Sequence, residues 1–131
     1  MSSCINCNGL IGRNSTKYCS NQCQHDYQYS LYITNWLSGK VYGGTHNGVS
    51  SHIKRYLREK NNDSCQKCNW NEINVHTGLV PLEVDHIDGN HKNNNKSNLR
   101  LLCPNCHSLT STYKSLNKGN GRSWRNKASL T

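Results

Sequence analysis

The sequence predicts a small α+β protein that is stabilised by zinc. The first reason is its composition: only 33% of the 131 residues are apolar and phenylalanine is absent. A chain this polar cannot offset its loss of conformational entropy by burial alone. The second reason is a set of eight cysteines that form four close pairs with none left over. The length allows one compact domain, or two small ones that each need extra stabilisation.

The cysteines allow two interpretations, either four disulfides in a secreted scaffold or two four-thiolate zinc sites in a reducing compartment. The beginning, Met1-Ser2-Ser3-Cys4, has no basic and apolar signal sequence, and no segment approaches the ~20 apolar residues of a membrane span. Cysteines two or three residues apart also suit a tetrahedral metal. Zinc is therefore the favoured interpretation, and we expect a cytoplasmic protein that is not secreted.

The first cysteine set has the spacing C-x2-C-x11-C-x3-C and begins at Cys4. Each close pair offers two thiolates from one tight turn, which we call a knuckle, and the intervening loop brings the two knuckles together. Ser20 is placed to cap a helix over about residues 21–37. Residues 1–38 are thus expected to form a zinc ribbon with a linking helix.

A glycine-rich stretch over residues 39–48 is expected to be a flexible linker. A second helix should begin at Ser50 or Ser51 and end near Glu59. One face of this helix is basic, which indicates either an ordinary solvated surface or a DNA contact. The basic residues are Lys54, Arg55 and Arg58.

The second cysteine set joins a knuckle at 65/68 to another at 103/106, with 34 residues between them. Pairing each set within itself follows from proximity, because crossed pairing would require a tangled chain path. Between the knuckles, an apolar run from Leu82 to Ile87 predicts a short strand that carries Asp85 and His86 at its end. A polar loop and a returning strand over 99–102 follow. Pro104 suits the first turn of a helix that continues to about Tyr113, which completes a ββα unit.

The charge of the chain is one-signed over its last third. No acidic residue follows Asp88. Such a run predicts a polyanionic partner, most simply nucleic acid, although a charged and solvated tail is the alternative. The basic residues in this region are Lys92, Lys96, Arg100, Lys114, Lys118, Arg122, Arg125 and Lys127.

The series Glu83-Val84-Asp85-His86-Ile87, Asn98-Leu99-Arg100-Leu101-Leu102 and Cys103-x-x-Cys106-His107, preceded by Cys65-x-x-Cys68, closely resembles the HNH nucleases that carry a four-cysteine zinc site. The resemblance covers roughly residues 49–113. It implies a ββα-metal, treble-clef-like nuclease domain, and a free-standing phage or homing-type DNA endonuclease in a bacterial or phage-infected cell.

The resemblance also implies a role for each site residue. His86 would be the general base that activates water, a task for which a neutral imidazole has a suitable pKa. Asp85 and His107 would hold one catalytic divalent cation, Mg²⁺ or Mn²⁺, whose identity their mixed ligands leave open. Asn98 would fix the loop by hydrogen bonds and so aim His86. Two structural zinc ions would be bound by Cys4, Cys7, Cys19 and Cys23, and by Cys65, Cys68, Cys103 and Cys106.

The expected partner is double-stranded DNA, without a membrane or a small-molecule substrate. A single ββα site addresses one strand, so a monomer would nick, and the oligomeric state is left open. The residues 114–131 form a basic tail. The alternative function is a zinc-stabilised DNA-binding module without catalysis. The residues expected to contact DNA are Lys54, Arg55, Arg58, Lys92, Lys96, Arg100, Lys114, Lys118, Arg122 and Arg125.

Overall fold

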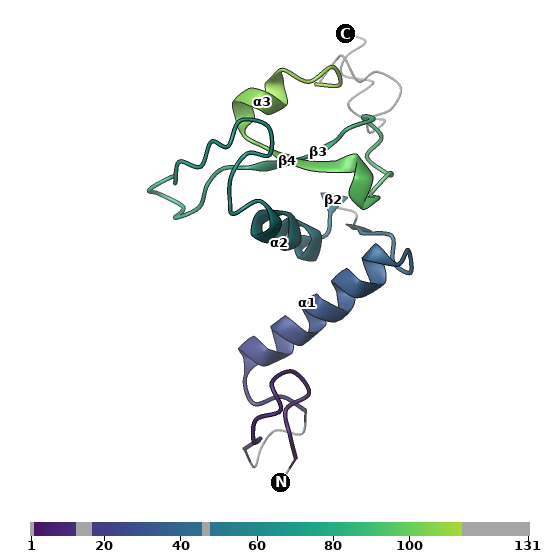
Figure 1. Ribbon diagram of the computed structural model, residues 1–131, viewed down its shortest axis with the longest axis vertical. Coiled ribbons are helices and arrows are strands. Elements are labelled where there is room, and N and C mark those ends of the chain that lie inside the picture. The colour runs from purple at the N-terminus through teal and green to yellow at the C-terminus, as the bar shows by residue number, and fades with distance from the viewer. Residues whose placement is uncertain (1, 13–16, 46–47, 114–131) are drawn as a thin grey trace. The chain divides into compact units, whose positions relative to one another are not determined.

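The computed structural model describes residues 2–12, 17–45 and 48–113 (Figure 1). The chain forms two compact units, with the boundary between Val41 and Tyr42. The fold is small and α+β, with two two-stranded sheets among the described residues. The α+β class predicted from the sequence is therefore confirmed.

The first unit consists of a short cysteine-bearing ribbon and one long helix. An antiparallel bridge joins Ser3 to Leu10 in the ribbon. Helix α1 covers Asn21–Leu37, and the hydroxyl of Ser20 caps it by accepting a hydrogen bond from the backbone N–H of Cys23 at 3.1 Å. The predicted helix and its cap are confirmed. Among the described residues, no helix is both long and apolar enough to cross a membrane.

The second unit begins with a small hairpin and a helix. Strand β1, Gly44–Thr45, pairs antiparallel with β2, Gly48–Val49, so part of the expected linker forms a strand. Helix α2 covers Ser51–Lys60 and is capped by Ser50, whose hydroxyl accepts from the backbone N–H of His52. The sequence-based expectation for this helix is confirmed to within one residue at its C-terminal end.

The ββα unit follows. Strand β3, Glu83–His86, pairs antiparallel with β4, Leu99–Leu102, and a short 3-10 helix η1, Lys96–Asn98, leads into β4. The register places Asp85 opposite Arg100 and His86 opposite Leu99. Helix α3 covers Pro104–Ser108, with Pro104 in its first turn.

The prediction that α3 continues to about Tyr113 is wrong. The helix ends at Ser108, where serine and threonine hydroxyls take up its last carbonyl groups. Ser108 Oγ donates to the carbonyl of Asn105 at 2.7 Å, and Thr110 Oγ1 donates to that of His107 at 3.0 Å. These local bonds compete with the continuation of the backbone ladder.

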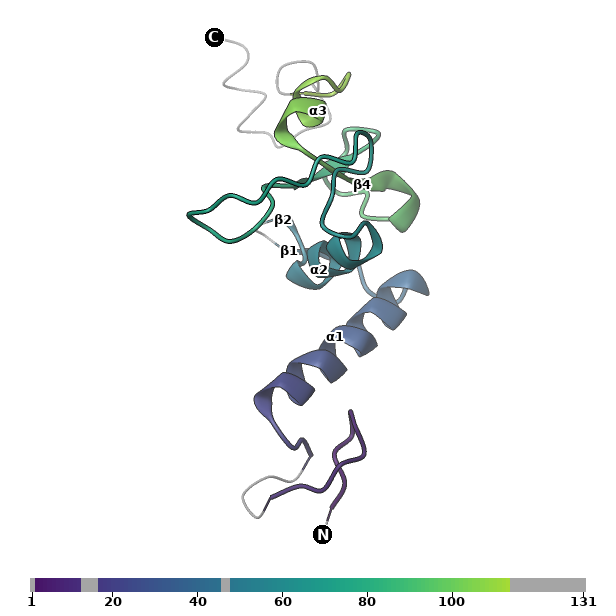
Figure 2. The ribbon, with the colours of Figure 1, turned by 60° about the vertical axis from the view of Figure 1, so that its left-hand side comes forward.

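The β3–β4 hairpin is the centre of the second unit. Helices α2 and α3 both contact it, and they lie on opposite sides of it (Figures 1 and 2). Leu101 and Leu102 are 1% and 0% exposed although neighbouring side chains in a strand point to opposite faces. Both faces of β4 are therefore buried.

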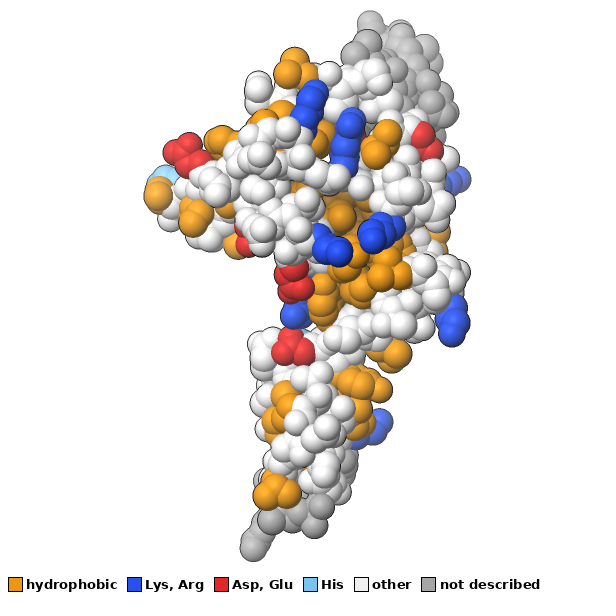
Figure 3. All heavy atoms as spheres, in the orientation of Figure 1, with side chains coloured by type: hydrophobic (Ala, Val, Ile, Leu, Met, Phe, Trp, Pro, Cys, Tyr) orange, Lys and Arg blue, Asp and Glu red, His pale blue; other side chains and the backbone are white. Residues whose placement is uncertain are grey.

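A loop from the Cys65–Cys68 knuckle to Val80 extends away from this centre. An antiparallel bridge between Asn74 and Leu79 closes it. Ile73, Val75 and Leu79 in this loop are exposed, and Figure 3 shows the loop protruding from the second unit. At its two ends, Trp70 packs against the buried cysteines and Val80 is buried, so only the middle of the loop adds little to the core.

Replacing Leu101 by alanine is expected to lower the free energy of unfolding by about 2–5 kcal/mol, because it removes a fully buried side chain and leaves a cavity. The matched control is Leu79→Ala, since Leu79 is 58% exposed. The control should change stability by no more than about 0.5 kcal/mol. Denaturant unfolding of the zinc-loaded protein measures both, and equal effects would contradict the assignment of the core.

Candidate active site and metal centres

The eight cysteines gather into two clusters of four. Within each cluster the sulfur atoms all lie within 4.8 Å of one another. Individual Sγ–Sγ distances are 3.6 Å for Cys7–Cys19, 3.4 Å for Cys19–Cys23 and 3.7 Å for Cys68–Cys103. Four thiolates in a tetrahedron around zinc, with bonds of about 2.3 Å, are about 3.8 Å apart. Each cluster could therefore hold one zinc ion, and the grouping of the four close cysteine pairs expected from the sequence is confirmed.

Both clusters are built in the same way, from one knuckle and the beginning of one helix. In the knuckles the backbone N–H of Cys4 donates to the carbonyl of Gly9, and that of Cys65 to the carbonyl of Trp70, each at 2.8 Å. Asn8 and Asn69 follow the knuckles with positive φ angles of 63° and 66°, which asparagine tolerates better than most residues. The remaining thiols lie where α1 and α3 begin.

Within a cluster the thiols differ in acidity. Burial raises the pKa of Cys65, but backbone hydrogen bonds, led by the one from Cys103, outweigh it and lower that pKa to about 6. Burial and hydrogen bonds with the other thiols raise the pKa of Cys106 to about 12. In the first cluster the pKa of Cys4 is likewise lowered to about 6, with burial again opposing the backbone hydrogen bonds. Each cluster thus offers a cation at least one thiolate at neutral pH.

A carboxylate and an imidazole meet beside the second cluster. Asp85, on β3, is 5% exposed, and its Oδ1 lies 3.7 Å from Nε2 of His107 on α3. The other carboxylate oxygen, Oδ2, accepts a hydrogen bond from Nε of Arg100 at 2.7 Å. Cross-strand pairing explains this second contact, because Asp85 and Arg100 are directly opposite and share one face of the hairpin.

Glu83 holds the other side of the His107 ring. Two residues before Asp85, it lies on the same face of β3, and its carboxylate pairs with Nδ1 of His107. A neutral His107 can donate a hydrogen bond to Glu83 through its Nδ1–H. The lone pair of Nε2 then stays free on the side of the ring that faces Asp85. A carboxylate behind a histidine is the usual arrangement for a metal-ligating imidazole.

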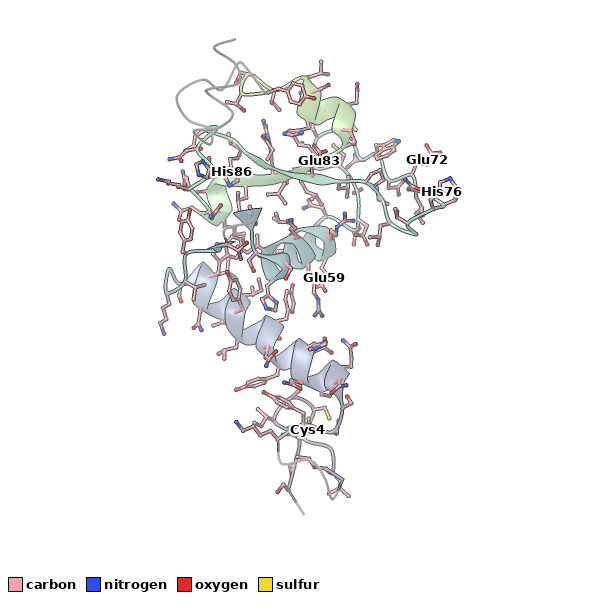
Figure 4. All side chains as sticks on the ribbon, turned by 180° about the vertical axis from the view of Figure 1, so that it is seen from behind. Cys4, Glu59, Glu72, His76, Glu83 and His86 are labelled. Carbon is pink, nitrogen blue, oxygen red and sulfur yellow. The ribbon has the colours of Figure 1, made fainter. Side chains whose placement is uncertain are left out.

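His86 projects from the opposite face of β3. Its side chain alternates with that of Asp85, and Figure 4 shows His86 and Glu83 at the two ends of the strand. Nε2 of His86 lies 2.7 Å from Oδ1 of Asn94, in the loop between the strands. The structure therefore separates the two halves of the expected site: the expected metal ligands face α3, and the expected base faces the loop.

Asn98 fixes the loop at its far end. Its side chain accepts from the backbone N–H of Asp88 at 3.0 Å and donates to Asp88 Oδ1 at 2.9 Å and to the carbonyl of Asn93 at 2.8 Å. Hydrogen bonds from Asn93, from the backbone of Asn90 and from Asn98 hold the pKa of Asp88 below its usual value. The stabilisation from this carboxylate is thus present above its unfolded pKa of about 4 and is lost as the pH falls through the lower folded value.

The basic residues expected to contact DNA have diverse surroundings. On α2, Arg55 pairs with Glu59 at 2.8 Å, and Arg58 pairs with Asp63 at 3.4 Å and donates to the carbonyl of Val80 at 3.1 Å. Figure 3 shows basic side chains spread over the second unit rather than in one block. Lys54 and Lys92 are exposed, and the ammonium of Lys96 lies 5.9 Å from the centre of the Tyr56 ring. Lys114, Lys118, Arg122 and Arg125 lie outside the described residues.

Sequence reasoning missed three contacts of the site. The contact of Glu83 with His107 could have been predicted from the sequence, because Glu83 and Asp85 are two residues apart in a strand and so share a face. The contact of Asn94 with His86 could not be predicted, because asparagines occur throughout this loop and nothing in the sequence distinguishes Asn94 from the others. Gln66 of the knuckle is the third: its backbone N–H donates to the carbonyl of Leu101 at 2.8 Å, and its side-chain oxygen accepts from the backbone N–H of Leu101 at 3.2 Å.

A family model and one relative are similar to parts of the chain. Residues 65–112, which contain the Cys65–Cys68 knuckle, the β3–β4 hairpin and α3, match the family model of the HNH endonucleases. A segment of 40 residues is 60% identical to the H-N-H endonuclease F-TflIV of Escherichia phage T5. That match covers 30% of this chain and 18% of the phage protein, so the chain spans a small part of its relative. No solved structure matches the chain. Residues 65–112 are therefore similar to the HNH endonuclease family.

Proposed function

We propose that the chain is a divalent-metal-dependent endonuclease that hydrolyses phosphodiester bonds in double-stranded DNA. The observation that carries this proposal is the approach of Asp85 Oδ1 to His107 Nε2 at 3.7 Å. Each group is also held from behind, the carboxylate by Arg100 and the imidazole by Glu83. A module that only bound DNA would not need a buried carboxylate and an imidazole oriented toward one point.

The donor set fits one small divalent cation. Two metal–ligand bonds of about 2.0–2.1 Å can span the distance between these two atoms, and a carboxylate with one imidazole suits Mg²⁺ or Mn²⁺. When bound, such a cation would polarise the phosphate and stabilise the leaving oxygen. Asp85 supplies a negatively charged oxygen. His107 supplies the unprotonated Nε2 of a neutral imidazole, because Glu83 selects the ring tautomer that carries its proton on Nδ1.

His86 is proposed as the general base that takes a proton from the attacking water. Asn98 keeps the loop in place through Asp88 and the backbone of Asn93. Nδ1 of His86 is the candidate atom for the proton, because Nε2 contacts Asn94. Proton transfer to a positioned histidine typically contributes about 10²–10⁴-fold to the rate.

The four-cysteine clusters are proposed to bind one structural zinc ion each. Structural zinc supplies on the order of 10 kcal/mol or more to a small module.

Along the chain we propose a zinc unit with its helix at 1–38, a linker at 39–48, a nuclease domain at 49–113 and a basic tail at 114–131. Exposed basic residues would neutralise phosphates of the DNA. Each phosphate contact would steepen the slope of the logarithm of the binding constant against the logarithm of the salt concentration by about 0.9. With one site, a monomer would nick one strand.

The first test compares wild type with His86→Ala on supercoiled plasmid, with Mg²⁺ or Mn²⁺ supplied. Loss of the base should slow nicking by about 10²–10⁴-fold while DNA binding persists. The matched control is His76→Ala, an exposed histidine in the protruding loop, which should nick at the wild-type rate. Gel electrophoresis of the plasmid measures the rates. Chelation of all metal is a poor control because it also removes structural zinc.

Two outcomes would contradict the proposal in different ways. Equal nicking by wild type and His86→Ala would show that another group is the base. Binding of DNA by wild type without cleavage under either cation would support the alternative function, a zinc-stabilised DNA-binding module.

The second test is the zinc content of the purified protein. We expect two equivalents in wild type and one in Cys65→Ser, because three thiolates hold structural zinc poorly and the two clusters are built from separate segments. The matched control is Ser64→Ala, which changes the neighbouring hydroxyl and should keep both ions. Elemental analysis by mass spectrometry measures the content, and an unchanged content in Cys65→Ser would refute the assignment of the second cluster.

A further inference from the structure

We propose that Asn94 is a positioning residue that selects the tautomer of His86, and that Gly44 is required because it makes room for Asn94. The inference rests on the proposed function, in which His86 is the base. It adds how the free protein determines which ring nitrogen of His86 carries the proton.

The contact itself is short and sheltered. Oδ1 of Asn94 lies 2.7 Å from Nε2 of His86, and Asn94 is 4% exposed. An amide oxygen only accepts hydrogen bonds, so this contact places the proton of a neutral His86 on Nε2. The lone pair is then on Nδ1, at the other side of the ring, where it can accept a proton from water.

Asn98 acts on a different part of the loop. Its amide group bonds to Asp88 and to the backbone carbonyl of Asn93, the residue immediately before Asn94. Asn98 therefore shapes the loop, and Asn94 makes the contact with the imidazole. The two asparagines have separate tasks, which a substitution at each can distinguish.

Gly44, on strand β1, supports Asn94 from the other side. A Cβ atom added at Gly44 would lie 2.9 Å from Nδ2 of Asn94 and 2.4 Å from Cε1 of Tyr42. The ring of Tyr42 is exposed and can move away, whereas the amide of Asn94 is buried and held by His86. An alanine at position 44 would thus displace Asn94. The β1–β2 hairpin, although far from the site in sequence, sets the position of the amide.

The primary test is nitrogen NMR of the imidazole rings at a pH where His86 is neutral, with His86→Ala used to assign its signals. In wild type we expect one tautomer, protonated on Nε2, with a slowly exchanging N–H signal. Asn94→Leu, which has similar volume but no acceptor, should lose that slow signal and give averaged nitrogen shifts. The matched control is Asn95→Leu, an exposed asparagine without a side-chain capping bond, which should leave His86 unchanged.

Plasmid nicking supplies the second readout. Asn94→Leu should lower kcat by about 10²-fold with little change in KM, because a misaimed catalytic group costs about that much. Asn94→Asp keeps an acceptor oxygen and should recover part of the loss. In a His86→Ala background, Asn94→Leu should cause no further loss. Gly44→Ala should lower kcat in the same direction as Asn94→Leu, and it should also broaden the Nε2–H signal.

The outcomes separate this inference from the proposed function. An unchanged His86 tautomer and N–H exchange in Asn94→Leu would overturn the inference even if the protein cuts DNA. Equal activity of Asn94→Leu and Asn94→Asp, or an additional loss in the His86→Ala background, would also overturn it. If wild type cuts no DNA, the proposed function fails, whereas the NMR comparison still decides whether Asn94 selects the tautomer.

Discussion

The site depends on the register of the β3–β4 hairpin. Pairing of Asp85 with Arg100 and of His86 with Leu99 fixes which side chains share a face. Since successive side chains in a strand alternate, Glu83 and Asp85 face α3, and His86 faces the loop. A slip of one residue would exchange these faces and move the carboxylate away from His107. One short ladder therefore separates the proposed metal ligands from the proposed base.

The second cysteine cluster maintains this register from one end. Cys103 directly follows β4 and is the N-cap of α3, where its sulfur accepts from the backbone N–H of Cys106 at 3.4 Å. The knuckle at Cys65 also bonds to β4, through the backbone and side chain of Gln66. A metal ion in the cluster would fix the end of β4, the start of α3 and hence His107. Binding of a metal by the cluster would therefore affect the position of His107, because the N-cap of the helix that carries His107 is Cys103, a member of the cluster.

Much of this architecture was predictable because strong local signals specify it. Ser20 and Ser50 cap helices where the apolar period begins, and the knuckles specify their own pairing by spacing. The end of α3 was less predictable, since hydroxyl groups at Ser108 and Thr110 compete with the backbone ladder. The contacts at His86 could not be predicted. Several asparagines in the loop have equivalent local chemistry, and only the folded path buries Asn94 against the imidazole and beside Gly44.

The most direct test of the central claim is whether one cation lies between Asp85 and His107. Substoichiometric Mn²⁺ should first broaden the NMR signals of the His107 ring and the Asp85 amide, through paramagnetic relaxation. Asp85→Asn should raise the Mn²⁺ concentration needed by at least about tenfold, as loss of ligand charge weakens a hard-cation site. The control Asp63→Asn, at an exposed carboxylate, should change nothing. Broadening centred elsewhere, or equal affinity in Asp85→Asn, would contradict the account.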